Sequence, residues 1–88
     1  MENEIDEKSQ ILKAIANAKR LEILHHVGKK EYSVGALEKL VDLSQSALSQ
    51  HLAVLRRVGV VKTRRSAQTI YYRLSNEQVK KILKIFNL

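Results

Sequence analysis

One stretch decides the fold: residues 43–57 have the sequence LSQSALSQHLAVLRR. Within it, Leu48, Leu52 and Leu55 recur at the i, i+4 and i+7 spacing of an apolar stripe along a helix. Ser44 is a residue type that caps helix starts, and Gly59 follows two arginines as a typical helix end. The pattern predicts a helix over residues 45–58 with its leucines turned toward a core.

A shorter helix is expected directly before this one. Ser33 can cap a helix over residues 34–41, whose apolar residues also have helical spacing. Only residues 42–44 separate the two helices. Two short helices joined by such a turn are typical of a helix-turn-helix, which we predict over residues 33–58.

The period changes to that of β-strands after Gly59. Residues 60–63 and 69–74 are rich in the β-branched and aromatic side chains that favour strands. We expect an antiparallel hairpin, called the wing, over residues 60–74. Its tip is predicted to be a basic loop over residues 64–68.

Further helices are expected on both sides of these elements. Residues 3–16 carry an apolar stripe, residues 18–27 lie between the capping residue Asn17 and a glycine, and residues 76–87 follow a capping box at Ser75. The predicted fold class is therefore mainly α with a small β-hairpin. It is a winged helix-turn-helix in which four helices precede the hairpin and one follows it, within a single domain of residues 1–88.

Composition excludes several classes of protein. The chain has 88 residues, enough for one small core, and no cysteine, which excludes disulfides and thiolate metal sites. The acidic start lacks the apolar run of a signal peptide, and no stretch approaches the ~20 apolar residues of a membrane span. We expect a cytoplasmic protein without membrane contact.

The formal charge of +7 is unevenly distributed. Residues 59–74 hold four basic and no acidic side chains. Such a segment suits a polyanion, because each neutralised phosphate releases counterions. On charge alone, a merely solvated basic hairpin is the alternative.

The outward face of the 45–58 helix is formed by Gln45, Ser46, Ser49 and Gln50, which are short, uncharged and hydrogen-bonding. This face fits the major groove of DNA, about 12 Å wide, where Gln reads adenine and Ser bonds to several base edges. A helix face shaped only by contact with water more often carries Glu and Lys. We interpret these four residues as direct base readout of double-stranded DNA.

Side chains that can contact the DNA backbone flank this face, because backbone contacts fix the register in which bases are read. The expected backbone and wing contacts are Ser33, Ser44, His51, Arg56, Lys62, Arg64, Arg65, Gln68 and Thr69. For His51, packing at the edge of the helix is an open alternative. Tyr71 either reaches a phosphate or packs across the hairpin.

Five segments resemble the ArsR/SmtB family of winged helix-turn-helix repressors. They are residues 14–24 (AIANAKRLEIL), 33–37 (SVGAL), 43–52 (LSQSALSQHL), 55–65 (LRRVGVVKTRR) and 70–74 (IYYRL). Within the family, the chain resembles the branch of haemolysin-activator, nodulation and biofilm-growth regulators. The resemblance implies a homodimer built from the first and last helices, and repression relieved by a signal. The implied dimer interface is Ile5, Leu12, Ile15, Val79, Ile82, Leu83 and Phe86.

The residues that sense the signal in family members are missing here. The cysteine pair of arsenic-type sensors corresponds to Ser33 and Gly35, and the last helix lacks the Asp and His ligands of zinc-type sensors. The cysteines of sulfide- and redox-sensing members correspond to His25 and Asn87. Adjacent helical residues such as His25 and His26 point about 100° apart, which is poor geometry for one ion. We expect no metal, thiol ligand or cofactor.

Two functions follow from these patterns. The first is a homodimeric repressor whose two 45–58 helices enter successive major grooves of a pseudo-palindromic operator and so occlude a promoter. The alternative is a winged-helix protein–protein interaction module without DNA binding, which the apolar end helices would serve equally. The sequence has no carboxylate pair, Ser-His-acid set or glycine-rich phosphate loop, so we expect no enzyme.

Overall fold

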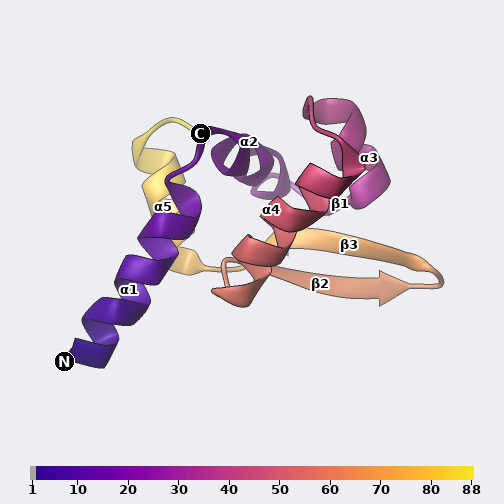
Figure 1. The fold of residues 1–88 in the computed structure, drawn as a ribbon. Helices are drawn as coiled ribbons and strands as arrows, with labels where there is room; N and C mark the ends of the chain where they lie inside the picture. Colours follow the sequence, from indigo (N-terminus) through magenta and orange to yellow (C-terminus); the bar gives the residue numbers. More distant parts are fainter. Residues whose placement is uncertain (1) are drawn as a thin grey trace.

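Helices form the body of the molecule, and a β-ribbon projects from it (Figure 1). A computed structural model describes residues 2–88. Along these residues the elements are α1 (Glu2–Ile15), α2 (Ala18–Val27), β1 (Tyr32–Ser33), α3 (Val34–Leu40), α4 (Gln45–Arg57), β2 (Val61–Ser66), β3 (Thr69–Leu74) and α5 (Glu77–Ile85). This order confirms the predicted winged helix-turn-helix, with one strand added.

The helices of the helix-turn-helix are capped by the residues expected from the sequence. The Oγ atom of Ser33 accepts a hydrogen bond of 3.1 Å from the amide of Ala36, and Ser44 Oγ accepts one of 3.1 Å from the amide of Ala47. After α4, Gly59 has a φ of 77°, in the left-handed region that favours glycine. Because these signals are local, α2, α3 and α4 lie within one residue of their predicted bounds.

The sheet has three antiparallel strands in the order β1-β3-β2, where the sequence predicted two. In β1, Tyr32 pairs with Tyr72 and Ser33 pairs with Tyr71. A strand of two residues has no period that a sequence pattern can reveal, and its partner lies far along the chain. β1 covers the edge of β3 directly before α3 begins.

The wing occupies the predicted residues, but its first strand is longer and its turn is tighter than predicted. β2 continues to Ser66, which pairs with Thr69, so a two-residue turn closes the ribbon. The predicted loop over residues 64–68 is therefore wrong, because Arg64 and Arg65 lie in β2. Charged residues are weak strand signals in a sequence, but a ribbon that is exposed to water accommodates them.

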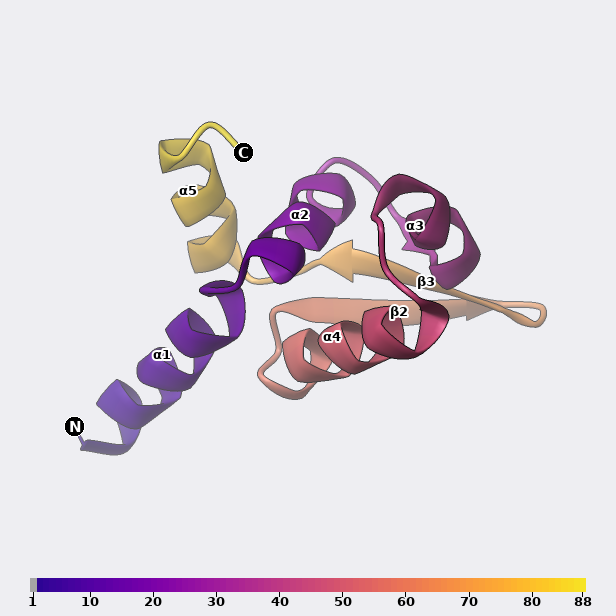
Figure 2. The ribbon, with the colours of Figure 1, turned by 45° about the horizontal axis from the view of Figure 1, so that its top comes forward.

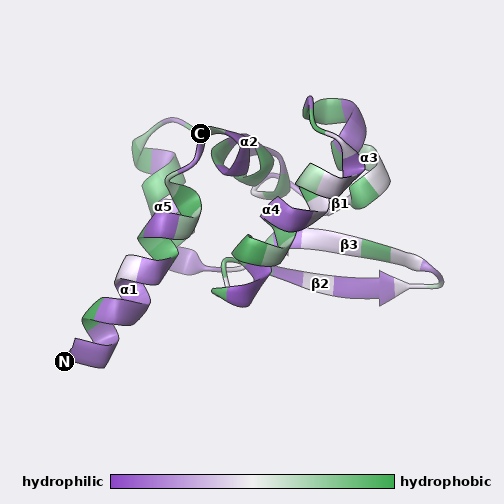
Figure 3. Ribbon diagram, in the orientation of Figure 1, coloured by the Kyte–Doolittle hydropathy of each residue, from purple (hydrophilic) through white to green (hydrophobic). Residues whose placement is uncertain are grey.

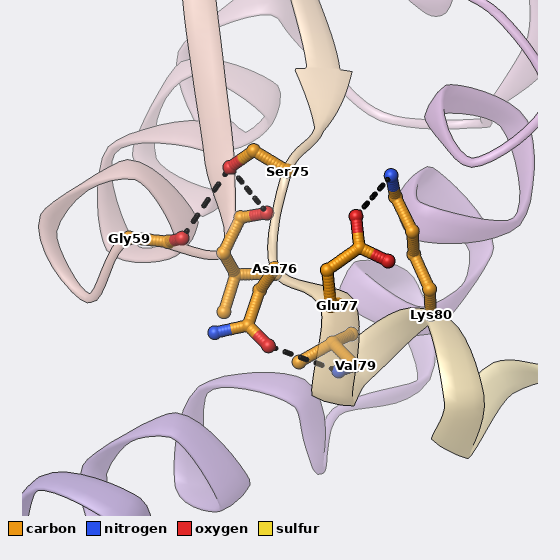
Figure 4. A network of polar contacts seen from close by, with 7 residues as sticks. Gly59, Ser75, Asn76, Glu77, Val79 and Lys80 are labelled. Carbon is orange, nitrogen blue, oxygen red and sulfur yellow. Dashed lines mark hydrogen bonds and ion pairs between the residues drawn. The ribbon is translucent and has the colours of Figure 1, made fainter.

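The start of α5 also differs from the prediction. The cap is Asn76, whose Oδ1 atom accepts a hydrogen bond of 3.0 Å from the amide of Val79 (Figure 4). Ser75, the predicted cap, instead directs its hydroxyl to the carbonyl oxygens of Val60 at 3.4 Å and Gly59 at 3.5 Å. Both residue types cap helices, so the contact of Ser75 with the α4–β2 turn decides between them.

One core is shared by all the helices and the base of the ribbon. Leu48, Leu52 and Leu55 are at most 1% exposed, which confirms the predicted stripe of α4. Burial of each large apolar side chain contributes roughly 1.5–3 kcal/mol, so α4 is held firmly from behind. The buried residues are Ala14, Ile15, Ile23, Leu24, Val27, Leu37, Val41, Leu48, Leu52, Leu55, Val60, Val61, Leu74, Val79 and Leu83.

α1 and α5 are both at the end of the molecule away from the ribbon tip (Figure 2). The Lys8 ammonium of α1 donates a hydrogen bond of 3.0 Å to Gln78 Oε1 of α5. No helix within residues 2–88 has the length and apolar character that crossing a membrane requires.

The side chains predicted for a dimer interface fall into two sets. Ile5, Leu12 and Phe86 are 60%, 52% and 68% exposed, and Ile82 is half-buried. In contrast, Ile15, Val79 and Leu83 are buried in the core of the protomer. Each end helix thus uses part of its apolar stripe to pack on its own protomer, and the exposed set is the part that is available to a partner.

Candidate nucleic-acid interface

The polar face of α4 has the geometry expected from the sequence. Gln45, Ser46, Ser49 and Gln50 are all exposed, and none of them is packed inside the protomer. The buried leucines on the opposite side hold the helix backbone in place. The face therefore offers amide and hydroxyl groups, which both donate and accept hydrogen bonds, from a rigid support.

As helix caps, Ser33 and Ser44 use only part of their capacity to form hydrogen bonds. In each of them the Oγ atom accepts a bond from a backbone amide, which leaves the hydroxyl proton available. Each serine also lies at a helix N-terminus, where the macrodipole is positive. Both positions can therefore donate to an anion such as a DNA phosphate.

The ribbon carries basic side chains on both of its faces. Successive strand residues point to opposite faces, and residues paired across the ribbon share a face. Lys62, which pairs with Arg73, therefore shares a face with Arg64. Arg65 lies on the other face together with the buried Val61, which packs toward the helices. The predicted wing contacts thus do not form one cluster, and Arg65 is on the helix side.

Arg64 is engaged within the protomer. Its Nε atom donates to both carboxylate oxygens of Glu31, at 2.7 and 2.9 Å. The guanidinium also lies 4.6 Å from the centre of the Tyr71 ring, a cation–π contact across the ribbon. Of the two interpretations of Tyr71, this contact supports cross-strand packing. Arg64 can reach a phosphate only by exchanging Glu31 for it.

Arg56 of α4 lies beside the ribbon. A shallow hollow of about 380 Å³ separates the helix from β3, and its lining is Ser49, Ala53, Arg56, Arg57 and Tyr72. Tyr72 belongs to the same ribbon face as Arg65, because Thr63, two residues before Arg65, pairs with it. The hollow therefore lies between the exposed polar face of α4 and the helix-side face of the wing. Beyond it, Gln68 and Thr69 are exposed at the ribbon tip, and β2 is hydrophilic along most of its length (Figure 3).

His51 is half-buried on α4 rather than fully open to solvent. Its Nδ1 atom lies 3.2 Å from Nη1 of Arg20 in α2. Burial lowers the pKa of His51 from 6.5, and the nearby Arg20 charge lowers it further. This contact supports the interpretation of His51 as a packed residue at the edge of the helix.

The two neighbouring histidines of α2 lie near the end of the chain. His25 Nδ1 is 3.1 Å from the carbonyl oxygen of Leu88, and the rings of His25 and His26 meet edge to face at 5.3 Å. Within residues 2–88, no three or more His, Cys, Asp or Glu side chains gather in a group that could hold a metal ion.

Sequence reasoning missed two charged residues of the site, Arg20 and Glu31. Arg20 contacts His51 on another helix, and Glu31 contacts Arg64 on the ribbon. Each pair joins residues more than thirty positions apart, with separations of 31 and 33. Only the opposite charges of Glu31 and the wing arginines hinted at one of these contacts.

Together, α3, α4 and the β2–β3 ribbon define a winged helix-turn-helix protein of the DNA-binding type. The helix with the exposed polar face is the second helix of the motif, the one that enters the major groove in such domains. Basic residues accompany it on the helix and in the ribbon, and the capping serines Ser33 and Ser44 lie at the helix starts.

Comparison with known proteins gives the family. Residues 17–63 match the family model described as bacterial regulatory protein, arsR family, and the chain belongs to this family. It is 52% identical over 77 residues to the transcriptional activator HlyU of Vibrio cholerae, covering 88% of this chain and 71% of HlyU. It is 60% identical over 72 residues to the nodulation protein NolR of Rhizobium meliloti, covering 82% of this chain and 59% of the length of NolR.

A solved structure has the same fold. It is the solution structure of the homodimeric winged helix-turn-helix DNA-binding domain Mb0332 from Mycobacterium bovis, described as a possible ArsR-family transcriptional regulator. The two chains superpose with a TM-score of 0.86 at 29% sequence identity, covering 94% of this chain and 77% of that domain.

Proposed function

We propose that the chain is a homodimeric transcription regulator of the bacterial cytoplasm that binds a pseudo-palindromic operator in double-stranded DNA. The observation that carries this proposal is the α4 surface. Gln45, Ser46, Ser49 and Gln50 are exposed together on a helix that is fixed from behind by buried leucines. Uncharged hydrogen-bonding side chains on a rigid helix suit the base edges of the major groove.

Contacts with the DNA backbone come from the elements around α4. Arg56 and Arg65 flank the reading face, and Ser33 and Ser44 donate hydroxyl protons from the helix starts. Lys62, Gln68 and Thr69 add contacts along the ribbon, whereas Glu31 holds Arg64 away from the DNA backbone in the wild-type protein. These residues bind any sequence alike, because phosphates carry no direct sequence information.

The dimer forms through α1 and α5. The exposed apolar residues Ile5 and Leu12 line one side of α1, where a shallow hollow of about 700 Å³ is lined mainly by apolar atoms. The half-buried Ile82 lies on the adjacent α5, and the exposed Phe86 follows directly after that helix. Exposed apolar area of this kind is covered in stable proteins. The related Mb0332 domain is homodimeric, which supports the same assembly here.

DNA binding acts on transcription by occlusion. Two α4 helices of a dimer enter major grooves about one helical turn (~34 Å) apart, and a protein seated across that length blocks access to a promoter. In vitro transcription from an operator-containing promoter decreases as the dimer is added. An increase in transcript would instead identify an activator.

Point variants test the division between base and backbone contacts. Gln50→Ala and Ser46→Ala are expected to weaken operator binding by about 1–3 kcal/mol and leave random DNA binding unchanged. Arg65→Ala is expected to weaken both kinds of DNA equally. Gln10→Ala, at an exposed glutamine of α1, is the matched control. Equal losses on both DNAs for all three variants would contradict the proposed roles.

A second pair of variants tests the dimer. Leu12→Glu places a charge in the proposed interface and is expected to give monomers in analytical ultracentrifugation. Leu40→Glu makes the same change at a residue of α3 that is 44% exposed, and this variant is expected to remain dimeric. A wild-type monomer that does not bind duplex DNA at low salt would favour the protein-interaction module instead.

A further inference from the structure

Arg20 of α2 is the side chain at which three helices meet. Its Nε atom donates a hydrogen bond to the carbonyl oxygen of Ala14, near the end of α1. Its Nη1 atom lies 3.2 Å from Nδ1 of His51 on α4. Arg20 is half-buried, so both contacts are partly shielded from water. One guanidinium therefore joins α1 to α4 through α2.

The bond to α1 satisfies a backbone group that the helix leaves open. Ala14 belongs to the last turn of α1, where carbonyl oxygens have no partner within the helix. A cation at a helix C-terminus is also favoured by the helix macrodipole. The arginine thus fixes the end of α1 both by a hydrogen bond and by charge.

The bond to α4 defines the chemical state of His51. A guanidinium has only donors, so Nδ1 of His51 must be the acceptor and the ring proton must lie on Nε2. The ring that accepts this bond is neutral. Burial and the Arg20 charge both lower the pKa of His51, which favours the same neutral form.

The planar guanidinium fixes the relative position of the two groups that it binds. Its donors point in set directions, unlike the mobile ammonium of lysine. At one end of this link is α1, which bears the proposed dimer contacts Ile5 and Leu12. At the other end is α4, one residue after the proposed base-reading Gln50. A change in the angle between α1 and α4 would therefore stretch one of the two hydrogen bonds.

We propose that Arg20 is a positioning residue that ties α4 to the dimer helix α1 and thereby sets the distance between the two base-reading helices of the dimer. This inference rests on the proposed function, because it needs a dimer that reads two half-sites. Arg20 itself does not contact DNA in this arrangement. It acts through the neutral ring of His51 on one side and the α1 carbonyl on the other.

The experiment compares Arg20→Met with Lys19→Met. Both variants remove one positive charge from the start of α2, but the ion pair of Lys19 is with Glu22 of its own helix, at 3.6 Å. Affinity is measured on the operator and on operators whose half-site spacing is changed by a single base pair. Urea unfolding and ultracentrifugation show that each variant is folded and dimeric.

The expected result is a loss of spacing preference. Wild type and Lys19→Met discriminate strongly against the altered spacings, whereas Arg20→Met binds all spacings with similar affinity. Binding of Arg20→Met to the native operator falls between about twofold and about thirtyfold, the range for residues that couple distant sites. If a folded, dimeric Arg20→Met keeps the wild-type spacing preference, the positioning role is overturned.

Variants of His51 close the test. His51→Gln offers an oxygen that can accept from Arg20 and is expected to retain the spacing preference, whereas His51→Leu loses it. In the His51→Leu background, Arg20→Met has no further effect, because the link is already broken. The proposal is overturned if the losses of affinity in Arg20→Met and His51→Leu add in the double variant. It is also overturned if the salt dependence of DNA binding decreases by about one phosphate contact in Arg20→Met but not in His51→Leu, because Arg20 would then contact DNA directly.

A measurement without DNA separates this inference from the proposed function. In nitrogen-15 NMR spectra of the wild-type dimer, His51 is expected as a single tautomer with an unprotonated Nδ1 and a protonated Nε2. In Arg20→Met the ring is expected to average between tautomers. If this signature is present but no duplex DNA is bound, the proposed function fails while the link itself stands. If His51 averages in the wild type, the link is absent.

Discussion

Removing the carboxylate of Glu31 is expected to strengthen DNA binding. In the folded protein this carboxylate receives both short hydrogen bonds of Arg64 and cancels the charge of that wing residue. Glu31→Gln keeps the size of the side chain and removes its charge. The pair is largely open to water, with side-chain exposures of 53% for Arg64 and 29% for Glu31, so its loss changes stability by less than about 1 kcal/mol.

The size of the effect follows from counterion release. The logarithm of the binding constant falls linearly with the logarithm of the salt concentration. Each additional phosphate contact increases the magnitude of this slope by about 0.9. If the freed Arg64 gains one contact, the ratio of variant to wild-type affinity is about 3.5 times larger at ~50 mM salt than at ~200 mM salt. The preference for one DNA sequence over another is unchanged, because the new contact is to the backbone.

Fluorescence anisotropy with a labelled duplex, titrated at several salt concentrations, measures this slope. Glu22→Gln removes the same charge from α2, away from the ribbon, and corrects for the general gain in positive charge. In the double variant Glu31→Gln/Arg64→Ala the extra slope disappears. A Glu31→Gln protein with the slope of Glu22→Gln would show that Arg64 does not reach DNA and would refute the reasoning.

Three further outcomes are expected from the core, the wing and His51. Leu52→Ala, at a side chain 1% exposed, should lower the free energy of unfolding by about 2–5 kcal/mol in urea titrations. Ala67 has a left-handed φ of 54°, so Ala67→Gly should raise stability by up to about 1 kcal/mol, whereas a loss would mean that the turn adopts another conformation in solution. Because the pKa of His51 is lowered by folding from 6.5, the unfolded chain binds the proton more readily; stability is therefore full above about pH 6.5 and declines as the pH falls through the folded value. In His51→Gln this part of the pH dependence should be missing, and an unchanged urea midpoint profile between the two proteins would contradict it.

The parts of the fold that the sequence predicted are those with local signals. The caps Ser33 and Ser44 and the leucine stripe of α4 involve residues within two turns of one another, so their pattern specified the helix-turn-helix and its exposed polar face. Where two neighbouring residues had similar capping ability, as Ser75 and Asn76 do, a contact with a distant turn made the choice.

The parts that were missed depend on contacts between distant residues. β1 forms because Tyr32 pairs with Tyr72 across the sheet, and no local sequence pattern around either residue predicts this strand pairing. Arg64 was predicted from the sequence to contact the DNA backbone, whereas in the structure it forms an ion pair with Glu31. Burial of Val79 in its own protomer likewise depends on how α5 docks, which the spacing of its apolar residues does not determine.

The way in which the β2–β3 ribbon is attached to the body of the protein affects which of its residues can be replaced during evolution. The Ser75 hydroxyl and amide both reach the Val60 carbonyl, and Val60 is itself fully buried, so the two strands are fastened where they leave the body. Beyond the ion pair of Arg64 with Glu31, the ribbon is open to water, since residues 65–70 are all exposed. Residues can therefore be exchanged or inserted near the tip without disturbing the reading helix. In the proposed DNA-binding role, affinity for flanking DNA and choice of operator can thus diverge independently among descendants of this chain.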